Sequence, residues 1–391
     1  MMAIVARAVA VWLVSLGLMA SEAQAAWYEA STDHFILYAD DKEAEIRLYA
    51  ENLERFHSAM EIVTGNILDA SSPSGRVQVY VVGSLKQVEK LAGQRGIAGF
   101  YLARAGNSAA FVQTIRNQEG SPHFSTVVMQ HEYAHHFLFS TTRFPMPLWM
   151  SEGAAEFFGA TGYRADGSVA VGLHASHRWR DLYFAKNTKI AVTPLLDYDP
   201  DKPFGTMDRD SFYSRAWLLY HFLSTKPERE GQLRAYWLNV LRGTPSIDAA
   251  QNAFGSVSQL ERELASYYRS RQGKHIEVPA DKIEVGDVTL RALSEGEAAM
   301  MPVRIRSPRQ GREQAGAGSP RHREEAQRRC AGAECTRKSR VRRRECRCSH
   351  CCCRTRRKNR PEPARSACAQ RKSAFPQDFQ IASARWSGSG L

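Results

Sequence analysis

The sequence predicts an α+β protein with two lobes and a C-terminal tail. From residue 27 to about residue 118, short runs rich in β-branched and aromatic residues alternate with segments of helical apolar spacing. From residue 119 to about residue 275, the apolar spacing is mostly helical. Beyond residue 303 the composition changes abruptly to an Arg- and Cys-rich sequence. We therefore expect a small lobe with a mixed sheet and helices, a mainly helical lobe, and a disordered tail that cannot build a core.

The first 25 residues read as a cleavable signal peptide. Arg7 gives a positively charged start, and residues 8–19 form an apolar run that is too short for a comfortable membrane span. The small residues that follow predict cleavage between Ala25 and Ala26, and hence a periplasmic or secreted protein. An uncleaved N-terminal anchor is the alternative. No other stretch is long and apolar enough to cross a bilayer, so no membrane span is expected after cleavage.

The N-terminal lobe, residues 26–118, contains signals for both strands and helices. We expect strands over residues 34–38 and 77–82, and helices over residues 41–63 and 84–92. Two further apolar segments flank Gly106 and Asn107, which predicts a hairpin.

The segment His131-Glu132-Tyr133-Ala134-His135 has the spacing of a zinc-peptidase signature. It lies in a predicted helix over residues 126–140, which contains no Gly or Pro. Positions four apart share one helix face, so His131 and His135 can aim two imidazoles at one metal ion. Glu132 lies beside them, within reach of a water molecule at the metal but poorly placed to be a ligand. The alternative is a pair of structural histidines on a half-buried helix.

A second helix is expected soon after the first. Pro145 and Pro147 interrupt the chain, and a helix can begin near Leu148. This helix carries Glu152 and, one turn later, Glu156. Catalytic zinc typically keeps three protein ligands and one open position, so a third ligand must come from outside the histidine pair.

Residues 131–135 followed by Trp149-Met150-Ser151-Glu152-Gly153 resemble the gluzincins, which are zinc peptidases with two His ligands and a Glu from the next helix. The likeness is to the peptidase-MA-like domains of bacterial envelope proteins and, more distantly, to zinc aminopeptidases and thermolysin. It covers roughly residues 27–271. The resemblance implies one Zn²⁺ per chain, with Glu152 as the third ligand and Glu132 as the general base.

The same resemblance implies that Glu156 orients a ligand histidine. A solvated helix face is the alternative for this carboxylate. The resemblance also implies that the zinc helix lies between the N-terminal lobe and the helical lobe. In this family an edge strand before the zinc helix binds the extended substrate by strand addition, and residues 108–113 are expected to form it.

The stretch from Ser211 to Leu219 resembles the helix start at which aminopeptidase gluzincins carry a Tyr that stabilises the oxyanion. Tyr213 matches that residue, so the resemblance implies that its phenol donates to the developing negative charge. The alternative is that Tyr213 belongs to an aromatic core face.

The stretch from Gly96 to Leu102 lacks the Glu with which the aminopeptidases hold the free amino group of their substrate. Aminopeptidase activity is therefore not expected. The expected function is a zinc-dependent peptidase that hydrolyses peptide bonds in a peptide or protein substrate outside the cytoplasm. The alternative is a catalytically inactive gluzincin-fold module that binds peptides or envelope partners. The sequence predicts neither the oligomeric state nor whether cleavage is internal or terminal.

Further helices are expected in the helical lobe, residues 119–275, over residues 212–225, 228–241, 247–254 and 257–271. They follow a loop in which His174 and His177 are expected to be solvated, and the alternative is that they point into the cleft. His136 should face away from the ligand side of its helix. Residues 276–303 read as a short β segment or linker.

The tail, residues 304–391, differs in kind from the rest of the chain. All eight cysteines lie between Cys330 and Cys368, and residues 301–391 hold 24 Lys and Arg against 7 Asp and Glu. Residues 1–300 hold 29 Lys and Arg against 34 Asp and Glu, so the basic character belongs to the tail and does not indicate a nucleic-acid partner. We expect the tail to result from a shifted reading frame. The remainder has no cysteine and needs no disulfide.

Overall fold

The computed structural model describes residues 27–68, 75–102, 108–142, 146–184, 191–197, 209–270 and 273–316. It confirms the α+β class, with a mixed six-stranded sheet in the N-terminal half and helices in most of the rest. The expected signal peptide, the turn at Gly106 and Asn107, and the predicted tail beyond residue 316 lie outside the described residues. The elements described below lie in one compact unit, apart from the part of the last helix that follows Pro308.

Six strands form the main sheet, in the order β4-β5-β3-β2-β1-β9. These strands are β1 (Tyr28–Ser31), β2 (Phe35–Ala39), β3 (Val77–Val81), β4 (Gly99–Leu102), β5 (Ala109–Val112) and β9 (Thr289–Ala292). The pairs β2–β3 and β3–β5 are parallel, and the other pairs are antiparallel.

The prediction that residues 108–113 form the edge strand is wrong. β5 pairs with β3 on one side and with β4 on the other, so β4 is the edge strand near the central helix. All four residues of β5 are buried, as expected for an interior strand. The sequence shows two arms of a hairpin but does not show which arm pairs with β3.

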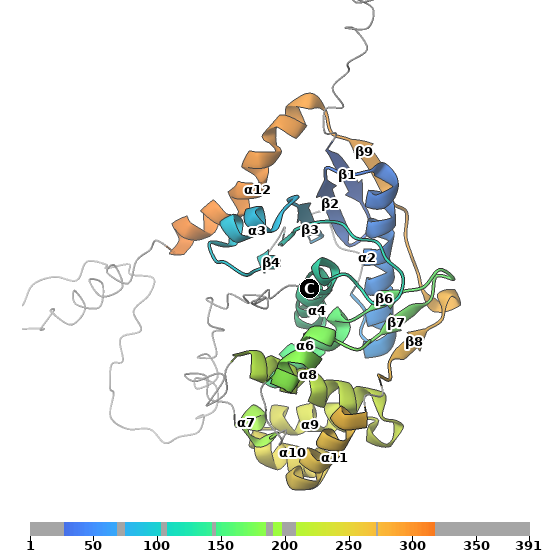
Figure 1. Ribbon diagram of the computed structural model, residues 1–391, viewed down its shortest axis with the longest axis vertical. Coiled ribbons are helices and arrows are strands. Elements are labelled where there is room, and N and C mark those ends of the chain that lie inside the picture. The colour runs from blue at the N-terminus through green and yellow to red at the C-terminus, as the bar shows by residue number, and fades with distance from the viewer. Residues whose placement is uncertain are drawn as a thin grey trace, which may run out of the picture. The chain divides into compact units, whose positions relative to one another are not determined.

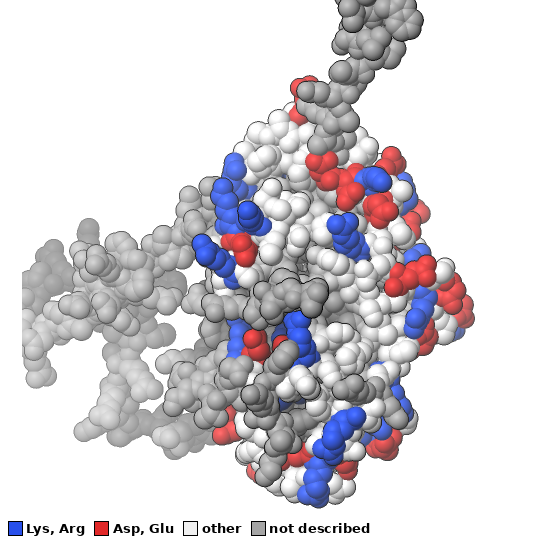
Figure 2. All heavy atoms as spheres, viewed as in Figure 1, with Lys and Arg blue, Asp and Glu red and all other residues white. Residues whose placement is uncertain are grey.

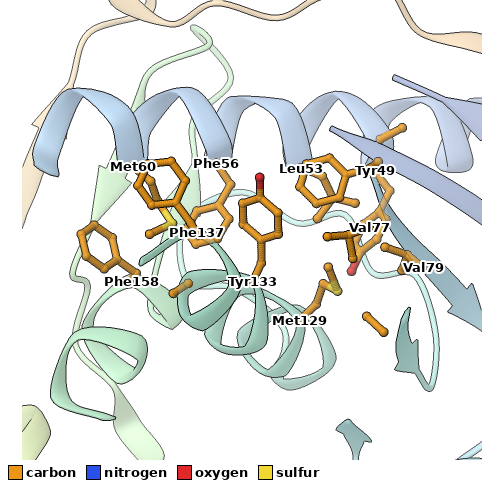
Figure 3. Packing of buried hydrophobic residues seen from close by; sticks show 14 of the residues in the cluster. Tyr49, Leu53, Phe56, Met60, Val77, Val79, Met129, Tyr133, Phe137 and Phe158 are labelled. Carbon is orange, nitrogen blue, oxygen red and sulfur yellow. The ribbon is translucent and has the colours of Figure 1, made fainter. Parts of the chain in front are cut away.

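One face of the sheet is covered by α2 (Glu43–Thr64) and α4 (Phe124–Thr141). Their apolar side chains meet over the sheet, with Leu53 and Phe56 of α2 facing Tyr133 and Phe137 of α4 (Figure 3). Nearly every residue of α4 between Ser125 and Leu138 is buried, which explains why the sequence of this helix is apolar almost all round.

The other face of the sheet carries a row of stacked aromatic rings. Tyr38, Tyr80, Phe111 and Phe100 follow one another with ring centroids 5.4, 5.3 and 4.6 Å apart. Two helices cover this row, α3 (Leu85–Ala92) and α12 (Glu295–Gly316), which lie close together in Figure 1. The expected boundary between residues 303 and 304 therefore falls inside α12.

The helical part begins with α5 (Leu148–Gly159), which packs against α4. It continues with α6 (Ser176–Phe184), α7 (Thr193–Leu196), α8 (Arg209–Thr225), η1 (Pro227–Arg229), α9 (Gln232–Leu241), α10 (Ser246–Phe254) and α11 (Val257–Ser270). A second sheet joins β6 (Gly162–Tyr163), β7 (Val169–Val171) and β8 (Ile276–Val278), and η2 (Ala280–Lys282) leads on to β9. Helix α4 thus lies between the main sheet and the helical part (Figure 1).

The face of the molecule shown in Figure 2 carries described residues of both charges. Lys and Arg side chains alternate with Asp and Glu side chains over the face shown in Figure 2. Among the helices in the described ranges, none has both the length and the apolar composition needed to cross a bilayer.

Candidate metal centre

Helix α4 places the two motif histidines on one face. The rings of His131 and His135 lie 4.8 Å apart at 79°, as expected for residues one turn apart. Both side chains are buried, at 7% and 2% exposure. Their direction is toward α5 and away from the sheet, because the opposite face of α4 is occupied by the apolar contacts with α2.

Helix α5 brings Glu152 to the same point. Its Oε2 lies 3.7 Å from Nε2 of His131 and 3.3 Å from Nε2 of His135. Two ligand atoms bound to a tetrahedral zinc at about 2.0–2.1 Å lie about 3.3 Å apart, so these separations fit one ion. Within the described ranges, these three side chains form the one group of His, Cys, Asp and Glu with metal-ligand proximity.

Two glycines allow α5 to approach its neighbours closely. A Cβ at Gly159 would lie 3.3 Å from the Cβ of His131, on α4. A Cβ at Gly153 would lie 2.5 Å from the carbonyl oxygen of Ala216, on α8. The residue after Glu152 must therefore be small for α8 to lie where it does.

The second nitrogen of each histidine ring is held by an oxygen. Nδ1 of His131 lies 3.2 Å from Oε1 of Glu156, and Nδ1 of His135 lies 3.3 Å from Oγ of Ser151. A proton on each Nδ1 can be donated to these oxygens, which leaves the lone pair of each Nε2 for a metal. Both Nε2 atoms and Oε2 of Glu152 are buried without a hydrogen-bond partner in the described part of the chain.

Unpartnered buried polar atoms are rare in proteins because each one costs free energy. Here three of them converge from two helices, and their types are two imidazole nitrogens and one carboxylate oxygen. This donor set suits a divalent transition metal. The buried group of His131, His135 and Glu152 can therefore hold a metal ion.

Glu132 lies in the same buried region, at 1% exposure. Neither of its carboxylate oxygens has a hydrogen-bond partner among the described residues. Burial raises the pKa of Glu132 well above its ordinary value, and the charges of Glu152 and Glu156 raise it further, while Arg209 opposes them. A carboxylate with a raised pKa is suited to accept and return a proton near neutral pH.

The other two carboxylates behave differently. Burial alone would raise the pKa of Glu152, but His135 and His131 outweigh burial and lower it. Burial would likewise raise the pKa of Glu156, but Arg178 and His131 hold it well below its ordinary value. These two groups are thus kept as anions, whereas Glu132 binds a proton more readily.

Tyr213 lies on α8 and is buried. Its ring is flanked by two guanidinium groups, that of Arg178 at 5.1 Å and that of Arg209 at 5.6 Å from the ring centroid. Burial raises the pKa of the Tyr213 phenol well above its ordinary value, and the nearby charge of Glu152 adds to the effect. A phenol with a raised pKa stays protonated near neutral pH, and a protonated phenol carries one hydrogen-bond donor.

Two residues near the site were missed by the sequence reasoning. His177 was expected to be solvated in a loop, which is wrong, because it lies on α6 and its Nε2 is 3.1 Å from Oε2 of Glu156. Arg178 follows it and lies 2.5 Å from Oε1 of Glu156. His177 and Arg178 are adjacent in the sequence, and neighbouring residues of this kind have no recognisable spacing signal. His174 is exposed, and His136 faces off the ligand side, where Nδ1 meets the hydroxyl of Tyr101 at 2.7 Å.

The structure thus gathers His131, Glu132, His135, Glu152 and Glu156 at one buried point, with Tyr213 close by. Comparison with protein-family models gives no match, and comparison with curated proteins gives none either.

Proposed function

We propose that the protein is a zinc-dependent peptidase of the gluzincin type. The observation that supports this best is the convergence of three unpartnered metal-binding atoms on a buried point beside a carboxylate, Glu132, that also has no partner in the described residues. Three protein ligands leave a position for water or substrate, which is the pattern of a catalytic rather than a structural zinc site.

Zinc is the ion that best suits two imidazoles and one carboxylate in this arrangement. The ion supplies Lewis acidity, which polarises a substrate carbonyl and lowers the pKa of water. The rest of the chemistry belongs to side chains of the chain itself.

Glu132 accepts the proton of the attacking water and returns it to the leaving amine. Its raised pKa matches this double role, because a base with an ordinary Glu pKa would return the proton less readily near neutral pH. The phenol of Tyr213 donates a hydrogen bond to the oxygen on which negative charge develops. Glu156 accepts the Nδ1 proton of His131 and so fixes the ring that carries one ligand nitrogen.

The substrate class in this proposal is a peptide or protein outside the cytoplasm. The location depends on the predicted signal peptide, and the substrate class depends on the resemblance of the 131–135 and 149–153 segments to the gluzincins. The missing amino-group ligand in residues 96–102 argues against an aminopeptidase.

The test combines metal content with cleavage of a fluorogenic peptide library by the purified chain that begins at Ala26. We expect about one zinc per chain in the parent and in Glu132→Gln, but activity only in the parent. Glu152→Ala should lose both. A parent that binds zinc but cleaves no peptide would favour a binding module, and equal cleavage by Glu132→Gln would remove Glu132 from the mechanism.

A further inference from the structure

Arg178 is a buried cation that the proposed mechanism does not use. It lies on α6, its side chain is 3% exposed, and it contacts Glu156 of α5 and the ring of Tyr213 of α8. A buried charge is expensive unless it is paired and hydrogen-bonded, so its partners indicate what it is for.

Its main partner is Glu156. Nη2 of Arg178 lies 2.5 Å from Oε1 of Glu156, the same oxygen that lies 3.2 Å from Nδ1 of His131. The second oxygen, Oε2, is 3.1 Å from Nε2 of His177. Both oxygens of this carboxylate are therefore held from α6, while one of them also faces the histidine on α4.

These contacts fix the orientation of Glu156. A carboxylate held only by His131 could rotate about its terminal bond and present either oxygen. With Arg178 on Oε1 and His177 on Oε2, rotation would break two contacts, and Oε1 stays in front of Nδ1 of His131. Charge-assisted bonds of this kind are both stronger and more directional than neutral ones.

The other side of the same guanidinium faces α8. Its Cζ lies 5.1 Å from the ring centroid of Tyr213, which is cation–π range. Nη1 of Arg178 lies 3.4 Å from Oδ2 of Asp181, which also accepts a hydrogen bond from Oγ of Ser214 at 3.4 Å. One side chain thus contacts both the carboxylate behind a ligand histidine and the phenol in the site.

We propose that Arg178 is a positioning residue that holds Glu156 against His131 and the ring of Tyr213 at its place beside the metal ligands. The inference rests on the proposed metal site. His177 assists by holding the second oxygen of Glu156. The guanidinium fork is needed for this role, because an ammonium group is a point charge and cannot span the carboxylate and the ring in the same way.

The first experiment measures binding of Zn²⁺ and Co²⁺ themselves to the purified chain, by competition with a chromophoric chelator and by the visible absorption of bound Co²⁺. We expect Arg178→Gln to weaken binding about 10- to 100-fold, as loss of support behind a ligand histidine does, and to shift the Co²⁺ bands. Arg178→Lys should fall between the parent and Arg178→Gln. Glu156→Gln should resemble Arg178→Gln, and the double variant should be little weaker than either single variant.

Arg229→Gln is the matched control. Arg229 also pairs with a carboxylate, Glu263, and lies over a ring of α8, with its Cζ 5.5 Å from the centroid of Phe222. It belongs to η1, and its hydrogen bonds among the described residues go to Gln232, the Phe254 carbonyl and Glu263, none of which belongs to the candidate metal group. It therefore reproduces the loss of a cation–carboxylate–ring contact, and metal affinity and the Co²⁺ bands should stay as in the parent.

The outcomes separate the two proposals. Equal metal affinity in the parent and in Glu152→Ala would overturn the metal site itself, and with it the peptidase. Loss of binding in Glu152→Ala, but parent-like affinity and Co²⁺ bands in Arg178→Gln, would overturn the role of Arg178 alone. Additive losses in the double variant would show that Arg178 does not act through Glu156. Should Arg178→Gln fail to fold, metal binding by Arg178→Ala is measured with millimolar guanidinium, and with urea as the neutral control. Recovery of metal affinity with guanidinium alone supports the proposal. Failure of guanidinium to restore metal affinity contradicts it.

Discussion

The two faces of α4 carry two groups of histidines that differ in one respect. The ligand face presents His131 and His135, and the rear face presents His136, which lies near His34 and His57 of the N-terminal lobe. Both groups are accompanied by buried carboxylates. On the ligand face, the Nε2 atoms converge without protein partners, whereas no ring nitrogen of the rear group is buried without a partner in the described residues.

The rear group is a chain of satisfied contacts. Nδ1 of His34 lies 2.8 Å from Oε2 of Glu54, and the ring of His34 stacks on His57 at 3.5 Å. Nδ1 of His57 is 2.7 Å from the hydroxyl of Tyr133, which comes from α4. These contacts tie α2 to α4 by hydrogen bonds in addition to the apolar packing around them.

The difference is the one expected between a histidine that can bind a metal and a structural one. His57 is as buried as His131, whereas His34 and His136 are half-buried, and all of them lie on or against the same helix. What differs is the completeness of their hydrogen bonding, because a site that awaits an ion must leave its ligand atoms unpaired. Burial and residue type alone would have put His57 and His131 in the same class.

The largest expected effect on stability comes from a metal ion bound at the ligand face. Excess zinc should stabilise the parent chain by about 4 kcal/mol at a free concentration a thousand times its dissociation constant. Thermal unfolding with added zinc and with a chelator measures this difference. Glu152→Ala should show no zinc-dependent shift, and a shift as large as that of the parent would show that zinc binds elsewhere.

The next largest expected effect on stability comes from a substitution on the rear face. Tyr133→Phe removes the hydroxyl that meets His57 and leaves a buried ring nitrogen unpaired, so we expect a loss of about 1–3 kcal/mol in the free energy of unfolding. Zinc content should not change. Tyr220→Phe is the control, because the Tyr220 hydroxyl has no hydrogen bond to another described residue. Urea unfolding of the two variants, together with metal analysis, tests whether the rear face contributes to stability but not to zinc binding. Loss of zinc in Tyr133→Phe would contradict this.

The rear face should also make stability depend on pH. Burial, assisted by the charge of His34, lowers the pKa of His57 to about 3. The unfolded chain protonates this residue at the ordinary histidine pKa of about 6.5, so the unfolded state binds more protons as the pH falls below that value. Stability is therefore lost as the pH falls from about 6.5 toward the folded pKa, by at most about 2 kcal/mol between pH 7 and pH 5.

The contribution of His34 to the pH dependence of stability has the opposite sign. Burial would lower its pKa, but the bond to Glu54 outweighs burial and raises it, so its contribution is complete below the ordinary histidine pKa and is lost as the pH rises through the folded pKa. We expect His57→Gln to flatten the decline of stability between pH 7 and pH 5. Urea unfolding at both pH values measures it, and an unchanged slope would assign the decline to other groups, such as His221, whose pKa burial lowers to about 4.

The smallest effect is expected from Ser151→Ala. The Oγ of Ser151 lies 3.3 Å from Nδ1 of His135, which is a long and neutral contact compared with the Glu156 contact to His131. We expect zinc affinity to fall by less than about tenfold, a smaller loss than in Glu156→Gln. Chelator competition compares the two, and a larger loss in Ser151→Ala would reverse the ranking of the two supporting oxygens.

Local rules predicted the parts of the site that depend on one helix. The i, i+4 spacing placed His131 and His135 on one face, and the structure has the helix over Phe124–Thr141 where residues 126–140 were expected. Glu152 was one of two carboxylates on the following helix, and the resemblance selected it. The position of Arg178 could not be predicted in this way, since it depends on how α6 packs against α8 and on the contact with Glu156 of α5. The order of β4 and β5 depends in the same way on pairing between distant segments.

The last strand of the main sheet has a consequence for the synthesis of the protein. β1 is paired on one side by β2 and on the other by β9, and Arg291 in β9 bonds to Glu29 in β1, 262 residues away. Closing so long a loop is slow relative to local helix formation. While the chain is growing, β1 is an open edge that can pair with other chains. A chain that ended before Thr289 would keep that open edge permanently and would be prone to aggregate, even though it retained every residue of the metal site.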